Sequence, residues 1–242
     1  MSADRKGSYG LDAPYMLVLP PAAMLLYLVW GLAAWTPGPL IGVPIMGACA
    51  FFGWHASRRG KFVVWNRLLD QIQLRGDERL LDLGCGRGAV LLMAAERLTT
   101  GRAVGVDLWR TVDQSGNAAD ATERNARAEG VADRIELHTA DMTALPFESN
   151  SFDLILSNIA IHNIKKAEGR RKAIDEAVRV LRPGGRLLIA DLFAIYEYQT
   201  RLTELKMSDV ALRSLGWRMW WGGPWMPTRL LTAVKPPEVR DN

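Results

Sequence analysis

The stretch from residue 80 to residue 95, LLDLGCGRGAVLLMAA, constrains the fold more than any other part of this chain. An apolar run ends in three glycines at alternate positions, Gly84, Gly86 and Gly88, and a second apolar stretch with the spacing of a buried helix follows at once. This order predicts a strand, a tight glycine turn and a helix. Glycines are needed where the backbone takes a positive φ or where a ligand approaches the main chain, and a helix N-terminus offers free N–H groups to such a ligand. A tight turn that binds nothing is the alternative.

An uncharged segment near the N-terminus sets the domain organisation. The chain has 242 residues and is 49% hydrophobic, yet no Asp, Glu, Lys or Arg lies between Asp12 and Arg58. Residues 1–12 are polar and are predicted to be flexible. Residues 13–35 and 40–56 are apolar runs joined by the turn sequence Thr-Pro-Gly-Pro, and each run has about the length that a hydrocarbon core of ~30 Å requires. We therefore predict a transmembrane helical hairpin over residues 13–57.

The charges at the ends of this hairpin predict its orientation. Arg5 and Lys6 precede it, Arg58, Arg59 and Lys61 follow it, and the connecting turn carries none, so both ends are expected on the cytoplasmic side of the cell membrane. A cleaved signal peptide is disfavoured, because the apolar run is too long and no cleavage pattern follows. A pair of buried core helices is the alternative, although prolines within both runs are tolerated better in membrane helices. Small residues at positions 47, 48 and 53 would allow homo-oligomers to form through the hairpin.

Charge and cysteine content exclude several classes of protein. The net charge is only +4, and the basic residues are interleaved with acidic ones, so nucleic acid is not an expected partner. The two cysteines, Cys49 and Cys85, form neither a disulfide framework nor a metal-binding pattern, and no metal site is predicted. These features fit a reduced enzyme that faces the cytoplasm.

The rest of the chain alternates strands and helices. Residues 58–74 are predicted to form a linker with an amphipathic helix, whose apolar face favours packing on a sheet. Within residues 75–242, strands are expected at 79–83, 102–107, 134–141, 152–158, 186–191, 217–221 and 229–234. Helices are expected at 89–98, 117–130, 169–181 and around 200–215. This alternation predicts an α/β domain with a mainly parallel sheet that is covered on both faces.

Four segments of this domain resemble a known family. They read LLDLGCGRG, VGVD, TADMTALPFESNSFDLILSN and VLRPGGRLLIADL. Together they look like a class I S-adenosylmethionine (SAM)-dependent methyltransferase over about two thirds of the chain. The resemblance implies a Rossmann-like, doubly wound, seven-stranded sheet, SAM as the cofactor and methyl transfer as the reaction.

The resemblance also implies a set of cofactor-binding residues: Asp82, Gly84, Cys85, Gly86, Gly88, Asp107, Leu108, Trp109, Asp141, Met142, Ser157 and Asn158. Asp82 and the glycine turn would hold the methionine part, and Asp141 and Met142 would contact the adenine. Asp107 ends the second strand 19 residues beyond Gly88, where an acid can accept hydrogen bonds from ribose hydroxyls because the second strand ends beside the first.

The glycine turn and the loop after Asp107 each allow another interpretation. Gly84, Gly86 and Ala89 also satisfy the G-x-G-x-x-A pattern of a dinucleotide-binding dehydrogenase, but that pattern alone is weak and the acid-ended third strand is not typical of such enzymes. The polar loop after Asp107 is longer than usual. It could close over the ligands or merely cap the next helix through Asn117.

One histidine is a candidate catalytic base, and the hairpin indicates the class of methyl acceptor. His162 follows the fourth strand and is the candidate catalytic residue, as a base for a hydroxyl or thiol acceptor; a structural histidine is the alternative. The hairpin favours a lipophilic small-molecule acceptor, such as a lipid, quinone, polyprenoid, phenol or thiol. A soluble acceptor, with the hairpin used for location or assembly, and a non-catalytic SAM-binding membrane protein are the alternatives.

Overall fold

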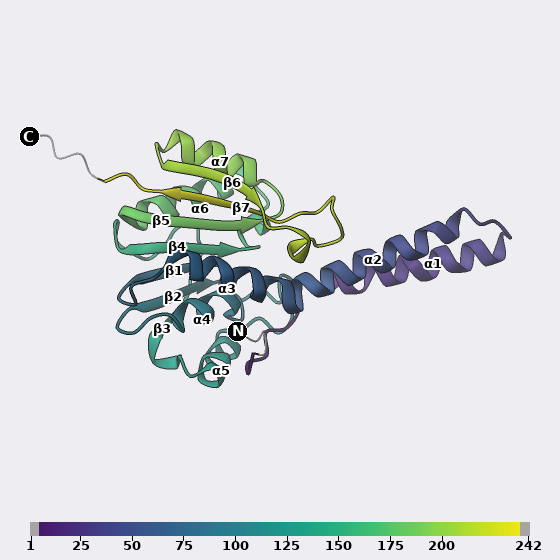
Figure 1. Ribbon diagram of the computed structural model, residues 1–242, viewed down its shortest axis with the longest axis horizontal. Helices are drawn as coiled ribbons and strands as arrows, with labels where there is room; N and C mark the ends of the chain where they lie inside the picture. The colour runs from purple at the N-terminus through teal and green to yellow at the C-terminus, as the bar shows by residue number, and fades with distance from the viewer. Residues whose placement is uncertain (1–4, 238–242) are drawn as a thin grey trace, which may run out of the picture.

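The computed structural model describes residues 5–237 and has two parts, an α/β domain and a helical hairpin that projects from it (Figure 1). The domain contains one seven-stranded sheet in the order β3-β2-β1-β4-β5-β7-β6. Its strands are β1 (Arg79–Leu83), β2 (Arg102–Asp107), β3 (Ile135–Thr139), β4 (Phe152–Asn158), β5 (Leu181–Asp191), β6 (Ser208–Ser214) and β7 (Arg229–Val234). Of the seven strands, β7 alone runs opposite to the others, so the sheet is mainly parallel, as predicted.

Helices cover both faces of this sheet because neighbouring residues of each central strand point to opposite sides. Leu80 packs into a core with α3 (Lys61–Ile72), α4 (Ala89–Ala95) and α5 (Ala119–Glu129). Leu81 packs into a second core with α6 (Ala167–Val180) and α7 (Ile195–Glu204). The strands between the two cores read as nearly continuous apolar runs, which is typical of a parallel sheet that is buried on both sides.

The C-terminal part of the domain differs from two of our predictions. The helix expected at 200–215 was wrong in its second half: α7 ends at Glu204, Lys206 takes a positive φ of 57°, and residues 208–214 form β6. The strand expected at 217–221 was also wrong, because Trp217–Met219 form a single 3₁₀ turn, η6, after Gly216. In both places the tertiary structure decided. Edge strand β6 pairs with β7, and η6 packs against the foot of the hairpin.

The hairpin consists of α1 (Leu19–Ala33) and α2 (Gly42–His55), which lie side by side (Figure 1). Gly31 and Gly42 allow the close approach, since a Cβ on Gly31 would lie 2.5 Å from Leu40 Cδ2 and a Cβ on Gly42 2.6 Å from the Tyr27 ring. Most of the large apolar side chains of α1 are exposed. The alternative prediction of two buried core helices is therefore wrong.

The prediction of two membrane-spanning helices is not confirmed. One continuous helical stretch, Pro39–Ile72, has 34 residues and is long and apolar enough to cross a membrane, with a mean hydropathy of 1.4 in its most apolar window. Helix α1 is apolar but has only 15 residues, about 22 Å at 1.5 Å per residue. A core helix or a signal sequence can satisfy the same criteria of length and composition, so they provide only weak evidence for a membrane span.

The second half of that long helical stretch is α3, which belongs to the domain. Its buried face includes Phe62, Trp65, Leu68, Leu69 and Ile72, the residues whose spacing predicted an amphipathic helix that packs on the sheet. Trp65 is fully buried. The segment between hairpin and sheet is thus a core helix of the domain, and α2 is joined to it without a flexible connection.

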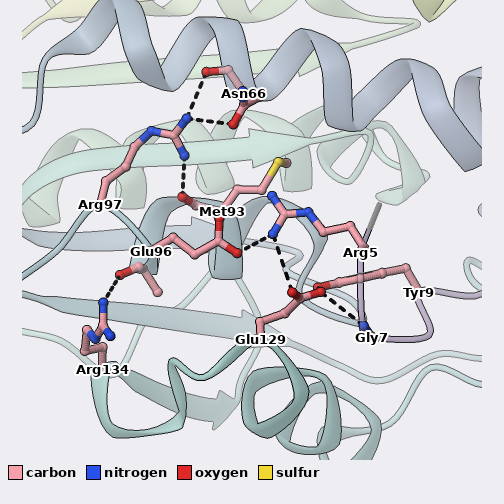
Figure 2. A network of polar contacts seen from close by, with 10 residues as sticks. Arg5, Gly7, Tyr9, Asn66, Met93, Glu96, Arg97, Glu129 and Arg134 are labelled. Atoms are coloured by element: carbon pink, nitrogen blue, oxygen red, sulfur yellow. Dashed lines mark hydrogen bonds and ion pairs between the residues drawn. The ribbon is translucent and has the colours of Figure 1, made fainter. Parts of the chain in front are cut away.

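The N-terminal segment, which the composition predicts to be flexible, is bound to the domain from residue 5 onward, while residues 1–4 lie outside the described residues. Figure 2 shows that Arg5 lies between Glu96 and Glu129. The Tyr9 hydroxyl and the Gly7 N–H donate to Glu129 Oε1 at 2.8 Å and 3.1 Å (Figure 2). These contacts attach the chain ahead of the hairpin to α4 and α5.

Candidate active site

A cavity of about 640 Å³ opens at the carboxyl ends of β1, β2 and β4. The strand order reverses between β1 and β4, and open α/β sheets bind their ligands at such a point because the loops on its two sides diverge. Nine of the predicted cofactor-binding residues line the cavity: Asp82, Gly84, Cys85, Gly86, Asp107, Leu108, Asp141, Met142 and Asn158. The fold therefore brings together residues from four separate segments of the chain.

The remaining three predicted residues do not line this cavity. Gly88 is the N-cap of α4, where it takes a φ of 84°. Ser157 is fully buried, and its hydroxyl donates to the Leu83 carbonyl at 3.0 Å. Trp109 packs against the core, and its Nε1 donates to Thr139 Oγ1 at 2.7 Å. All three have structural contacts that account for their positions.

The glycine turn has the geometry that the sequence predicted. Gly84 and Gly86 take φ values of 72° and 51°. A Cβ on Gly84 would lie 2.2 Å from Ala160 Cβ, and one on Gly86 would lie 2.5 Å from Gln114 Oε1. The Gly84 N–H donates to the Val106 carbonyl at 2.8 Å and so holds the turn against β2. Only glycine fits these two positions.

Asp107 is fixed at the end of β2 by three donors. Its Oδ2 accepts from the Gly86 N–H at 2.8 Å, and its Oδ1 accepts from the Trp109 N–H at 2.6 Å and from Asn117 Nδ2 at 3.1 Å. Asn117 Oδ1 is buried and has no partner among the described residues, although Asn117 also lines the cavity. Asn117 is not the N-cap of α5, which is Ala118, so its side chain serves this cavity and not the helix end.

Asp82 is the most deeply buried acid of the cavity. Its side chain is almost inaccessible, and its Oδ1 has no hydrogen-bond partner among residues 5–237. Burial, together with the nearby charge of Asp107, raises the pKa of Asp82 to about 7. A buried acceptor without a donor is costly, and a cationic ligand that donates to it would remove that cost.

The outer part of the cavity is less buried. Asp141 accepts from the Thr143 N–H at 2.9 Å, which fixes its carboxylate beside Met142. Leu108 follows Asp107 on the same side and is 43% exposed. These three side chains give a mixed polar and apolar rim, which suits a planar heterocycle better than a small ion.

His162 is oriented by a buried carboxylate. It lies in a short 3₁₀ turn after β4 and lines the cavity, and its Nδ1 is 2.5 Å from Asp191 Oδ1. Asp191, at the end of β5, is fully buried and also accepts from the His162 N–H at 3.1 Å and from the Tyr198 hydroxyl at 3.4 Å. Among the described residues Nε2 has no partner. The pair therefore presents an imidazole whose Nδ1 is engaged and whose Nε2 is free.

The protonation equilibrium of His162 reflects opposing effects. Burial lowers its pKa, but the hydrogen bond to Asp191 and the charges of Asp191 and Asp113 outweigh burial, so the pKa is raised above 6.5. The carboxylate stabilises the imidazolium and keeps the neutral ring in one tautomer. The Tyr198 hydroxyl, which also donates to the carboxylate of Asp191, helps to hold that carboxylate in place.

Sequence reasoning missed the contribution of the N-terminal segment to this cavity. Asp12, Ala13 and Tyr15 line it, together with Lys61 at the start of α3. No motif marks these residues; the only signal is that Asp12 is the last charged residue before the apolar run. The foot of the hairpin thus lies at the mouth of the cavity.

Asp12 connects the hairpin to the glycine turn. Its Oδ2 is 2.6 Å from Lys61 Nζ, whose side chain is almost completely buried, and its Oδ1 accepts from Gln114 Nε2 at 2.6 Å. Gln114 Oε1 in turn accepts from the Arg87 N–H at 2.7 Å. The long polar loop after β2 therefore closes against the N-terminal segment as well as the turn.

Comparison with protein families supports the resemblance seen in the sequence. The family model described as "Methyltransferase domain" matches residues 81–189. The ubiquinone/menaquinone biosynthesis C-methyltransferase UbiE of Roseobacter denitrificans is 32% identical over 124 residues, which cover 51% of this chain and 46% of that protein. Methyltransferase GfsG of Streptomyces halstedii is 33% identical over 126 residues, 52% of this chain and 42% of that protein. The chain spans about half the length of the curated relatives it matches.

Solved structures agree on the fold. A geranyl diphosphate methyltransferase in complex with SAM superposes on this chain with a TM-score of 0.57 at 18% sequence identity. The superposition covers 74% of this chain and 86% of that one. The [4+2]-cyclase SpnF superposes with a TM-score of 0.58 at 21% identity, over 72% of this chain and 82% of its own. Residues 81–189 therefore form a SAM-dependent methyltransferase domain, and SAM is the cofactor, as in that family.

Proposed function

We propose that this protein transfers the methyl group of SAM to a small lipophilic acceptor that carries an ionisable hydroxyl or thiol. The observation that carries the proposal is His162, held by buried Asp191 in the same cavity as the glycine turn and its acids. The cavity thus combines cofactor-binding groups with a base.

The residues of the cavity fit the cofactor. The buried, unpartnered Oδ1 of Asp82 would accept from the ammonium of the methionine part. Asp107 and the unpartnered Oδ1 of Asn117 would accept from the ribose hydroxyls, and Asp141 from the adenine amino group. When bound, SAM supplies an electrophilic methyl group on a sulfonium. Its positive charge suits a cavity that these carboxylates line.

His162 acts as the general base in this proposal. Its Nε2 would take the proton of the acceptor hydroxyl or thiol, and the oxygen or sulfur freed of that proton would accept the methyl group that SAM supplies, with S-adenosylhomocysteine as the leaving group. Asp191 stabilises the imidazolium and fixes the ring. Such a base contributes about 10²- to 10⁴-fold to a rate, and alignment and exclusion of water contribute the remainder.

The hairpin is the reason for proposing a lipophilic acceptor. Most of the large apolar side chains of α1 are exposed, the hairpin carries no charged residue, and it begins beside Tyr15 at the mouth of the cavity. We propose that it lies in a bilayer and that the acceptor reaches the cavity from there. Several relatives are C-methyltransferases of ubiquinone or menaquinone biosynthesis by their names, and quinones are among the acceptors that we propose.

A soluble small-molecule acceptor is the second candidate, with the hairpin used for location or assembly. The short α1 favours it, since a helix of 15 residues spans less than a hydrocarbon core of ~30 Å. In a third alternative the protein binds SAM without turnover, and the hairpin contacts a partner.

The first experiment is calorimetric titration of the detergent-purified full chain with S-adenosylhomocysteine, with NAD as the control ligand. We expect the wild type to bind S-adenosylhomocysteine and not NAD, and Asp107→Ala to bind at least tenfold more weakly. A wild type that binds NAD instead would refute the proposal.

Radiolabelled SAM and a panel of prenylated quinols, phenols, apolar thiols and their water-soluble analogues then test the reaction. Turnover of the apolar members that His162→Gln lowers at least a hundredfold, without a change in S-adenosylhomocysteine affinity, is the expected result. Turnover of soluble analogues alone would favour the second candidate, and binding without any turnover the third.

A further inference from the structure

A second cavity, of about 760 Å³, lies at the foot of the hairpin. It is bounded by the end of α2, the π-helical turn that follows it (Ala56–Gly60), the N-terminal segment and η6. The backbone of η6 is tightly packed here, since a Cβ on Gly60 would lie 1.8 Å from the Arg218 carbonyl oxygen. Figure 1 shows the loop that precedes β7 beside the start of the hairpin. The methyltransferase reaction uses none of these residues.

The charged residues that line this cavity are all arginines: Arg5, Arg58, Arg59 and Arg218. Arg5 forms an ion pair with Glu96. The other three have no ion pair with any described residue, and no aspartate or glutamate lines the cavity. Guanidinium groups gathered around one space without a carboxylate repel one another, and an anion in that space would neutralise them.

Aromatic side chains surround the same place. Trp54 lines the cavity, and Trp217 stacks on His55 with ring centroids 4.8 Å apart. The guanidinium carbon of Arg218 lies 4.7 Å from the Trp217 ring centroid, which holds Arg218 without neutralising it. Both tryptophans are about two-fifths exposed, at 41% and 43%. Partly exposed tryptophans beside basic residues are typical of the boundary between lipid and water.

The length of the second arm of the hairpin would place Arg58 at the surface of a bilayer. From Pro39, where the long helical stretch begins, to Arg58 the rise is about 28 Å at 1.5 Å per residue, close to the ~30 Å of a hydrocarbon core. No charged residue interrupts this length. Lys61, which the sequence grouped with these cations, is buried in its ion pair with Asp12 and takes no part.

We propose that the hairpin-foot cavity binds the phosphate of an anionic phospholipid headgroup through Arg58, Arg59 and Arg218. Arginine suits this ligand because its planar guanidinium can donate two parallel hydrogen bonds to one phosphate. The apolar hairpin beside the cavity would receive the acyl chains. The inference rests on the lipid-facing hairpin of the proposed function, and it adds the headgroup that the foot recognises.

Vesicle flotation of the purified full chain tests this. Phosphatidylcholine vesicles with and without phosphatidylglycerol are compared for the wild type and for Arg58→Gln/Arg59→Gln/Arg218→Gln. The matched control, Arg75→Gln/Arg127→Gln/Arg171→Gln, removes the same net charge from exposed arginines elsewhere. We expect the site variant to lose about 100-fold in affinity for anionic vesicles, and the control to lose only a few-fold. Unchanged S-adenosylhomocysteine affinity in both variants shows that the fold and the cofactor site are intact.

Three results would overturn the inference. Equal losses in the two triple variants would mean that only net charge matters. Equal affinity of the wild type for neutral and anionic vesicles, or for neither, would mean that no headgroup is recognised. Saturable binding of inorganic phosphate that Arg218→Gln abolishes, with no preference for anionic vesicles, would identify free phosphate as the ligand. None of these results depends on turnover, so failure of methyl transfer is distinguished from failure of the headgroup site.

Discussion

Replacing Asp191 with asparagine tests the role assigned to His162 most directly. Asp191 is fully buried and accepts from four donors: the His162 ring and N–H, the Leu192 N–H and the Tyr198 hydroxyl. An asparagine has the same shape, but one of its two terminal atoms is a donor. In either amide orientation that donor faces another donor, so at least one buried group loses its partner.

The magnitude follows from this arrangement. A buried donor left unpaired costs about 1–3 kcal/mol, so Asp191→Asn is expected to lower the free energy of unfolding by that amount at high pH. At low pH the loss is larger. Because the pKa of His162 is raised in the folded protein, its contribution to stability is complete below the ordinary histidine pKa of about 6.5 and is lost as the pH rises through the folded value. In the variant, burial is no longer opposed by Asp191, so the pKa of His162 falls.

Nuclear magnetic resonance titration of the imidazoles measures this without any acceptor, because the chain has only three histidines and His162→Gln assigns the signal. We expect the His162 pKa to lie above 6.5 in the wild type and in Tyr198→Phe, and to fall in Asp191→Asn. Methyl transfer by Asp191→Asn should be about tenfold to a hundredfold slower at neutral pH, as a loss of 1.5–3 kcal/mol implies. An unchanged His162 pKa in Asp191→Asn would refute the reasoning.

Three further predictions follow from the cavity and its surroundings. Asp82→Asn should raise the free energy of unfolding at pH 8 by roughly 2–4 kcal/mol, because a carboxyl whose pKa is raised to about 7 destabilises the fold as the pH rises above 3.8. The same variant should bind S-adenosylhomocysteine at least tenfold more weakly. Chemical denaturation measures the first effect and calorimetry the second. Lys61→Met should cost about 3–5 kcal/mol in urea unfolding by leaving Asp12 with an uncompensated charge, and Asp12→Asn in the same chain should restore most of that loss. Gly84→Ala should abolish S-adenosylhomocysteine binding, since its Cβ would overlap Ala160 at a positive φ, whereas Gly130→Ala, at a positive φ with open space, should bind normally although it is less stable.

The local sequence by itself determined the three central strands β2, β1 and β4 of the sheet. The strands that flank the glycine turn are apolar on both faces, and their ends carry the acids, so pattern alone located β1, β2, β4 and the positions of Asp82 and Asp107. The turn glycines at 84 and 86 could be recognised because only glycine tolerates both the positive φ and the crowding found there.

The tertiary structure decided the remainder, because it depends on contacts between residues far apart in the chain. Residues 208–214 became a strand through pairing with β7, against the helical pattern of the segment. Asp12 reached the cavity only because Lys61 and Gln114 bind its two oxygens. Asp191 was recognisable as an acid at a strand end, but its partner in chemistry, His162, lies 29 residues away and meets it through the packing of β4 against β5. Sequence patterns specify local conformation and burial, whereas the pairing of polar groups across elements is fixed only when the sheet assembles.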